Sequence, residues 1–215
     1  MDLYEALYTT RAMRRTKPDP IPQDAVKLML DAAIRAPSGG NTQQWRWIAV
    51  TDRSVIERLG VLYAEAFDEG MATFYAGRGD AVRAAGDDQS VRVMTSSQWL
   101  RDNFGSLPLV VVAYIRNDPD GSSIYPAVWS LMLAARGQGV GTTLTTFLSY
   151  FRHAETAEAL DVPTEKGWKL AATVTCGYPL GHWGVASRPP VTDVAFLDRW
   201  GNSPAWTVDE PLWTG

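Results

Sequence analysis

The first residues of the chain alternate between amphipathic and turn-forming stretches. Leu3, Ala6 and Leu7 recur at helical spacing behind Asp2, which predicts a short helix with Asp2 as its N-cap. In "PQDAVKLMLDAAIRA" (22–36) the apolar positions again repeat every three or four residues. This repeat predicts a second helix with a proline in its first turn.

A polar turn then leads into a second series of elements. The sequence "PSGGNTQQ" (37–44) consists of turn-forming residues, and "WRWIAVTD" (45–52) has the length and composition of a strand. A further amphipathic pattern predicts a helix over 54–67. Residues 70–98 are polar, rich in glycine and weakly periodic. We therefore expect a mobile excursion or lid at about residues 70–105.

The second half of the chain is more regular. Apolar, β-branched runs predict strands over 108–116, 140–148 and 169–179, while helical spacing predicts helices over 123–137 and 155–162. Helices dominate, and no repeat or linker separates the elements. The pattern predicts one domain over residues 1–215, of the α+β or α/β class, with four or five strands.

The C-terminal tail, residues 181–215, is apolar without a clear period. It contains four of the nine tryptophans: Trp183, Trp200, Trp206 and Trp213. An apolar but irregular segment has to be covered by other protein, so we expect this tail to wrap around a partner subunit.

Composition excludes several classes of function. The net charge of −4 and the pI of about 5.2 argue against nucleic-acid binding. The first twenty residues lack the apolar core of a signal peptide and no apolar run is long enough to span a bilayer, so we expect no membrane contact and a cytoplasmic location. One cysteine and two histidines, without metal-ligand spacing, predict no metal site.

Two stretches carry candidate chemistry. Arg11, Arg14 and Arg15 form the one basic cluster, which suits a phosphate ligand but also a solvated helix end. The turn at 37–44 offers small residues that let a backbone approach a ligand, although it could equally be a plain connection. The glycines of "GQGVGTT" (137–143) follow a helix and precede a strand, the reverse of the order in a dinucleotide-binding fold.

Together these stretches resemble the nitroreductase family of FMN-dependent oxidoreductases. The motif "TTRAMRR" precedes "APSGGNTQQWRWIAV", and the later landmarks "AVWSLMLAARGQGVGTT", "VTCGYP", "SRPPVTDV" and "DRWG" follow in the family's order. The resemblance spans nearly the whole chain except residues 55–105. It implies a mostly antiparallel sheet of four or five strands flanked by helices, in an intertwined homodimer.

The resemblance also implies a set of cofactor-binding residues. Arg11 and Arg188 would bind the FMN phosphate, and Arg15 would lie near flavin N1 and the C2 carbonyl. Thr145 and Thr146 would line the edge that carries N5. Pro37, Ser38, Gly39 and Asn41 would reach the flavin of the other subunit.

Four further positions lie in or beside these motifs. Ala12 and Met13 belong to the same cofactor-binding motif, but Met13 replaces a serine of the family, and Gln44 replaces the proline of its Gln-Pro-Trp element. The loss of the serine removes one hydrogen-bond donor, at a cost of about 1 kcal/mol. Arg14 falls between the matched positions, and we interpret it as a surface charge.

The resemblance implies an enzyme that passes hydride from NAD(P)H through flavin N5 to a nitroaromatic, a quinone or an activated alkene. NADH, NADPH and a deazaflavin remain open as donors, with Arg78, Arg83 and Arg92 as candidates for the 2′-phosphate of NADPH. Two alternatives remain: a flavin-binding dimer without turnover, and a specialised relative of the dehalogenase or flavin-destructase type.

Overall fold

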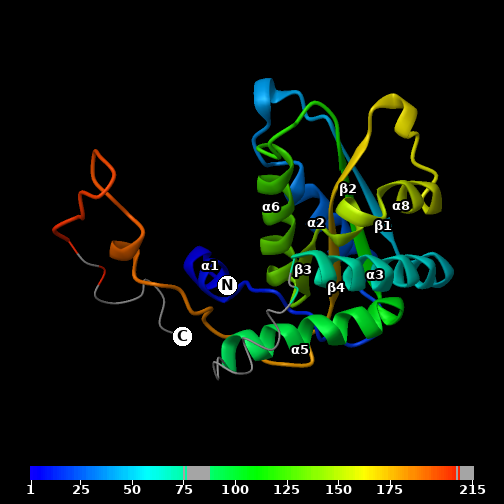
Figure 1. Cartoon of the computed structure of the whole chain (residues 1–215), viewed down its shortest axis with the longest axis horizontal. Helices are drawn as coiled ribbons and strands as arrows, with labels where there is room; N and C mark the ends of the chain where they lie inside the picture. Colours follow the sequence, from blue (N-terminus) through cyan, green and yellow to red (C-terminus); the bar gives the residue numbers. More distant parts are fainter. Residues whose placement is uncertain (75, 77–87, 207, 209–215) are drawn as a thin grey trace. The chain divides into compact units, whose positions relative to one another are not determined.

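The computed structural model describes residues 1–74, 76, 88–206 and 208. The chain separates into two compact units (Figure 1). The larger unit comprises residues 12–182, and the smaller one combines residues 1–11 with the C-terminal residues from 183 onward.

A four-stranded antiparallel sheet lies at the centre of the larger unit. Its strands are β1 (Trp45–Val50), β2 (Leu109–Ile115), β3 (Gly141–Thr145) and β4 (Lys169–Gly177). The strand order is β1-β2-β4-β3, and every neighbouring pair is antiparallel. This architecture confirms the predicted sheet and its number of strands.

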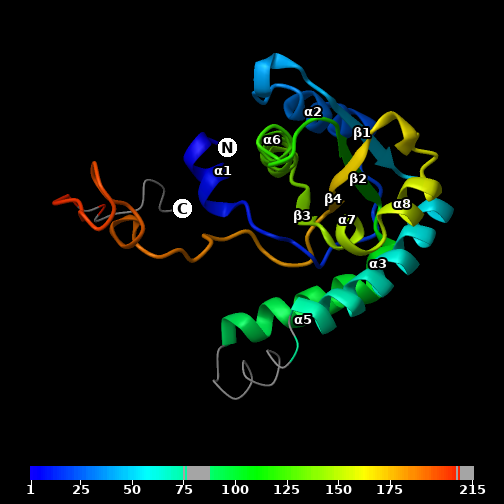
Figure 2. The same cartoon turned by 45° about the horizontal axis from the view of Figure 1, so that its top comes forward.

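Helices cover both faces of this sheet (Figure 2). One face carries α2 (Gln23–Ala33) and α6 (Ile124–Gly137), and the other carries α3 (Arg53–Phe74), α5 (Asp88–Asn103), α7 (Phe147–Phe151) and α8 (His153–Ala159). Short 3-10 turns at Gly39–Asn41, Phe104–Ser106 and Thr164–Lys166 connect the elements.

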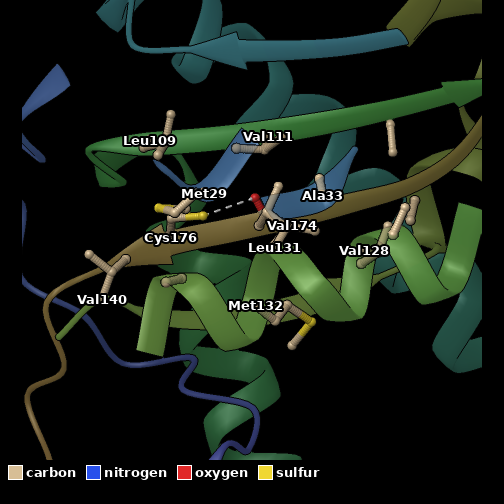
Figure 3. Packing of buried hydrophobic residues seen from close by; sticks show 14 of the residues in the cluster. Met29, Ala33, Leu109, Val111, Val128, Leu131, Met132, Val140, Val174 and Cys176 are labelled. Atoms are coloured by element: carbon tan, nitrogen blue, oxygen red, sulfur yellow. Dashed lines mark hydrogen bonds between the residues drawn. The ribbon is translucent and has the colours of Figure 1, made fainter. Parts of the chain in front are cut away.

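Strand β2 is buried along its whole length and contributes to two separate cores. Its odd-numbered residues, such as Leu109 and Val111, pack with Met29 of α2 and Leu131 of α6 (Figure 3). The even-numbered residues, such as Val110, face α3 and α7 instead. Because successive side chains of a strand point to opposite faces, this one apolar run joins the two layers of helices.

The region predicted as an excursion or lid is largely helical where the structure describes it. Helix α3 continues to Phe74, and α5 begins at Asp88; residues 75 and 77–87 lie outside the described part. In the described part of α5 beyond Asp88, Leu100 is the single fully buried side chain. Because so few positions of this helix are buried, its apolar residues do not recur at helical spacing. The sequence therefore does not predict this helix.

Strand β3 is shorter than predicted. The apolar run over 140–148 suggests one strand, but the strand ends at Thr145 and helix α7 starts at Phe147. The helix predicted over 54–67 begins as expected but extends to Phe74, and the other predicted helices and strands are confirmed within a few residues at each end.

The smaller unit contains helix α1 (Leu3–Thr9) and the described part of the tail. Asp2 caps the helix as predicted, since its Oδ1 accepts a hydrogen bond from the Glu5 amide at 2.8 Å. The described part of the tail contains one short 3-10 turn, Val191–Asp193. Its contact with a partner subunit stays a prediction.

Candidate functional site

The segment that follows Arg11 forms an extended arm, residues 12–17. The Met13 amide donates to the Thr142 carbonyl of β3 at 2.9 Å, and Ala12 pairs with Thr142 in an isolated bridge. Further along, the Lys17 amide donates to Tyr178 at 2.8 Å. These hydrogen bonds fix the arm beside the end of the sheet.

Two glycines let the arm approach so closely. A Cβ on Gly141 would lie 2.8 Å from Met13 Cβ, and a Cβ on Gly177 would lie 2.6 Å from Thr16 Oγ1. Any side chain at either position would push the arm away from β3 and β4. The glycines therefore determine where the arginines of the arm lie.

The arm borders a cavity of about 1020 Å³ in the larger unit. The cavity lies between the arm, the end of β3, helix α7 and the facing sides of α3 and α5. Its volume is at the upper end of the range for small-molecule sites. Among the described residues, six aromatic side chains line it: Tyr63, Phe67, Phe74, Trp99, Phe147 and Tyr150.

Among the predicted cofactor-binding residues, the cavity brings together Arg15, Thr145 and Thr146. It also brings in Arg14, whose half-buried guanidinium donates from Nη1 to Ser96 Oγ of α5 at 3.2 Å. The interpretation of Arg14 as a surface charge is therefore wrong. The sequence does not show this because it does not predict that α5 covers the arm.

Tyr63 is a site residue that the sequence analysis missed. Its ring is 2% exposed and stacks on Phe104, with 4.5 Å between the ring centroids. Burial raises the pKa of its hydroxyl, while a hydrogen bond to the Thr145 side chain and the charge of Arg14 act in the opposite direction. Tyr63 thus lines the cavity together with Thr145 as a neutral group. The helical period of 54–67 predicts that Tyr63 is buried, but not that it meets Thr145.

The loop after α2 carries the residues predicted to reach the other subunit. The Gly39 amide donates to Ser123 Oγ at 3.2 Å, and Gly40 and Asn41 have φ angles of 57° and 54°. Pro37, Gly39 and Asn41 are exposed, Ser38 is half-buried, and none of the four is among the cavity-lining residues. In a single chain this loop therefore has no part in the cavity.

The remaining predicted pair, Arg11 and Arg188, lies in the smaller unit. The Ala186 amide donates to the Tyr8 carbonyl at 3.0 Å, which joins the two segments that carry these arginines. Arg11 Nη2 lies 4.0 Å from the position a Cβ would take on Gly184. Both side chains are exposed. That they share one phosphate stays a prediction.

The two departures from the family motifs have structural roles. Met13 is 8% exposed and packs against Gly141, so it contributes apolar contact where the family has a hydroxyl. The Gln44 carbonyl and side chain accept from the Arg116 amide at 3.0 Å and from Asn117 Nδ2 at 2.8 Å. Gln44 therefore ties the start of β1 to the end of β2.

In the described part of the chain, the other reactive groups do not assemble into a second centre. Cys176 is completely buried, which raises the pKa of its thiol and keeps it protonated. Within the described residues, no three metal-ligating side chains gather in one place. None of the described helices has the length and apolar character of a membrane span.

Comparison with known proteins places this geometry in context. The model of the nitroreductase family matches residues 7–178. The 5,6-dimethylbenzimidazole synthase of Rhodospirillum rubrum is 26% identical over 193 residues, which cover 83% of this chain and 82% of that protein. An NADH dehydrogenase of Thermus thermophilus is 40% identical over 52 residues, about a quarter of each chain (24% and 25%).

The fold matches solved structures over most of the chain. The FMN-dependent nitroreductase NfnB from Mycobacterium smegmatis, in complex with NADPH, superposes with a TM-score of 0.67 at 23% identity. The superposition covers 92% of this chain and 100% of that one.

Proposed function

Because the chain belongs to the nitroreductase family, we propose that it is an FMN-dependent oxidoreductase that reduces an electron-poor small molecule with NAD(P)H. The observation that carries this proposal is the cavity, which combines two arginines of the N-terminal motif with an aromatic wall. For a nitro group, NAD(P)H, a proton and the nitro compound give NAD(P)⁺, the nitroso compound and water. When bound, FMN supplies the hydride relay through N5.

The residues present fit a flavin mononucleotide. Arg15, Thr145 and Thr146 already line one cavity, with a cation for the N1 edge and polar groups for the N5 edge. A guanidinium near N1 favours the negatively charged reduced ring. Arg11 and Arg188 would bind the phosphate, and the arm would contribute the backbone of Ala12 and Met13.

A homodimer is part of the same proposal. The exposed loop carrying Pro37, Ser38, Gly39 and Asn41 would complete the partner's site. The tail has large apolar side chains open to solvent in the single chain, with Trp200 92% and Trp206 46% exposed. Apolar exposure of this size supports a tail that packs on a second copy.

The absorption spectrum of the purified protein tests the proposal. We expect the bands of a bound flavin, release of FMN on denaturation, and bleaching of the bands by NADH or NADPH without oxygen. Arg11→Ala and Arg188→Ala should each lower the amount of flavin retained, because a charge-assisted contact to a phosphate contributes about 1.5–3 kcal/mol. Unchanged flavin content in both variants would contradict the assigned phosphate site.

The two alternative functions, a specialised relative and a binding protein without turnover, predict different results in these experiments. The similarity to the synthase of R. rubrum over 83% of the chain is compatible with a specialised relative, for which the flavin-destructase type is one candidate. In that case reduced flavin in air should be broken into fragments that mass spectrometry detects. A dehalogenase would release halide from a halogenated aromatic. A binding protein without turnover would show no NAD(P)H oxidation, so bound flavin with NAD(P)H oxidation rejects it.

A further inference from the structure

One face of helix α3 is aromatic from its buried middle to its C-terminal end. Tyr63, Phe67 and Phe74 are separated by four and by seven residues, a spacing that places them on the same side of the helix. All three line the cavity. Their exposed fraction rises from 2% at Tyr63 and 4% at Phe67 to 55% at Phe74. The lining therefore stays aromatic at the point where it reaches solvent.

Gly70 lets this face of α3 pack directly on α7. A Cβ on Gly70 would lie 2.6 Å from Phe147 Cδ1 and 3.0 Å from Phe151 Cε2, so no side chain fits between the two helices at this point. The Phe151 ring lies 6.4 Å from the Phe147 ring and 5.5 Å from the Phe74 ring, measured between centroids. These contacts hold Phe74 against α7 at the exposed end of the lining.

Tyr150 of α7 continues the lining beside Phe74. The two rings make an edge contact, with 6.2 Å between their centroids and 74° between their planes. Tyr150 is 68% exposed and lines the cavity. We call Phe74 and Tyr150 the outer ring pair. Two rings that meet at the lining of one cavity leave contiguous apolar surface in water, and a ligand that covers them removes this surface from water.

The outer ring pair has no role in the proposed cofactor site. The residues assigned to the flavin ring, Arg15, Thr145 and Thr146, lie on the arm and at the end of β3, whereas the pair lies on α3 and α7. The cavity volume of about 1020 Å³ suits a cofactor ring and a second planar ligand together. The outer ring pair is thus suited to the molecule that the flavin reduces.

We propose that the cavity selects planar electron acceptors with two or more fused aromatic rings, and that the outer ring pair binds the ring farther from the reacting group. Aromatic side chains bind a flat ring through offset stacking and edge contacts, which a saturated and puckered ring does not make. The inference rests on the proposed function for the reaction itself. Binding of the fused rings does not require turnover and is measured separately.

Three neutral amides test the binding by calorimetry on the purified protein with the flavin that it retains. Benzamide has a single ring and 2-naphthamide has fused aromatic rings. The tetrahydro analogue of 2-naphthamide keeps the carbon skeleton and saturates the second ring, so it matches 2-naphthamide in apolar size but not in planarity. We expect the wild type to bind 2-naphthamide about threefold to tenfold more tightly than the tetrahydro analogue.

Anaerobic steady-state kinetics tests the same contact with a reacting acceptor. The compounds 4-nitrobenzamide and 6-nitro-2-naphthamide carry the same substituents on a single ring and on fused rings. Because the proposed contact forms when the acceptor binds, loss of the outer ring pair should raise the KM for 6-nitro-2-naphthamide and leave its kcat within about twofold. Both parameters for 4-nitrobenzamide should stay within the same limit.

The variants separate the two rings from a general change of the surface. Phe74→Leu and Tyr150→Leu should each lower the affinity for 2-naphthamide about threefold to tenfold and leave the affinities for benzamide and the tetrahydro analogue within about twofold. Tyr150→Phe keeps the ring and should behave as the wild type. Tyr4→Leu removes an exposed ring of α1 that does not line the cavity, and it should change none of the affinities.

Four results would overturn the proposal. The first is a wild type that binds 2-naphthamide no more tightly than its tetrahydro analogue. The second is a pair of leucine variants that bind benzamide and 2-naphthamide with equal losses, and the third is a Tyr150→Phe variant that behaves as Tyr150→Leu. The fourth is a loss of flavin or of dimerisation in the leucine variants, because the outer ring pair would then belong to the cofactor site or to a contact between two copies of the chain.

The proposed function and the ring site can fail separately. If the protein does not oxidise NAD(P)H but still prefers 2-naphthamide through the outer ring pair, the proposed function fails and the ring site stands. If it oxidises NAD(P)H without this preference, the ring site fails alone. Thermal unfolding of Phe74→Leu and Tyr150→Leu checks that both variants fold.

Discussion

At the scale of single residues, burial decides which groups can take part in chemistry. Tyr63 and Cys176 are buried titratable groups whose pKa values are raised, so both stay protonated near neutral pH. Tyr63 lines the cavity beside Thr145, whereas Cys176 of β4 lies in the core facing α2 (Figure 3). Whether a buried titratable group belongs to the site or to the core therefore depends on the residues that surround it.

Tyr114 leads to a prediction about stability and pH. Its side chain is 1% exposed, its hydroxyl has no hydrogen-bond partner among the described residues, and burial raises its pKa to about 12. Between the ordinary tyrosine pKa of about 10 and this value, the unfolded chain loses the proton and the folded chain keeps it. The free energy of unfolding should therefore fall as pH rises through this window.

The substitution Tyr114→Phe removes the hydroxyl and keeps the ring. At pH 7 we expect the free energy of unfolding to stay the same or to rise by about 1 kcal/mol, since an unsatisfied buried polar group is removed. Above pH 10 the variant should lose less stability than the wild type. Urea unfolding at pH 7 and at pH 10.5 measures both effects, with Tyr150→Phe, an exposed position, as the control. A variant that is less stable at pH 7 would contradict the prediction.

At the scale of elements, the arm and α5 decide how the site is built. The sequence predicts the strands well because β2 and β4 are buried, β-branched runs. It predicts Arg15, Thr145 and Thr146 near a ligand only through the resemblance. It does not predict α5, whose apolar stripe is too narrow to give a period, and so it misplaces Arg14. Contacts between segments distant in sequence, such as Arg14 with Ser96, leave no local pattern.

A substitution at Gly141 tests whether the position of the arm determines the geometry of the site. In Gly141→Ala, the new Cβ would lie 2.8 Å from Met13 Cβ and 3.0 Å from Pro179 Cγ. The arm has to move, which should lower the free energy of unfolding by about 1–3 kcal/mol and lower the amount of flavin retained. Gly181→Ala, whose Cβ meets no atom within 4 Å, should change neither. Unchanged stability and flavin content in Gly141→Ala would show that the arm has freedom to adjust.

At the scale of the whole molecule, a single chain gives no role to two features, the loop after α2 and the C-terminal tail. The loop at Pro37, Ser38, Gly39 and Asn41 does not line the cavity, although the family motif places it at a flavin. The tail has exposed apolar side chains at Val185, Val194 and Trp200. The loop could not be interpreted from sequence without the resemblance, because its role depends on a surface that another copy of the chain would supply. The apolar and irregular composition of the tail, in contrast, is enough to predict that it packs on a partner subunit.

The tail tryptophans test the proposed dimer. In solution we expect a mass of twice the 23.7 kDa of one chain. Burial of a large aromatic side chain contributes about 1.5–3 kcal/mol, so Trp200→Gln and Trp206→Gln should each weaken dimerisation about tenfold or more. Sedimentation equilibrium measures the dissociation constant. Val61→Gln, which replaces a 61% exposed apolar side chain on α3, should leave it unchanged. A monomeric wild type, or a tail variant with an unaltered dissociation constant, would require the tail to pack on its own chain and the loop at 37–41 to have another role.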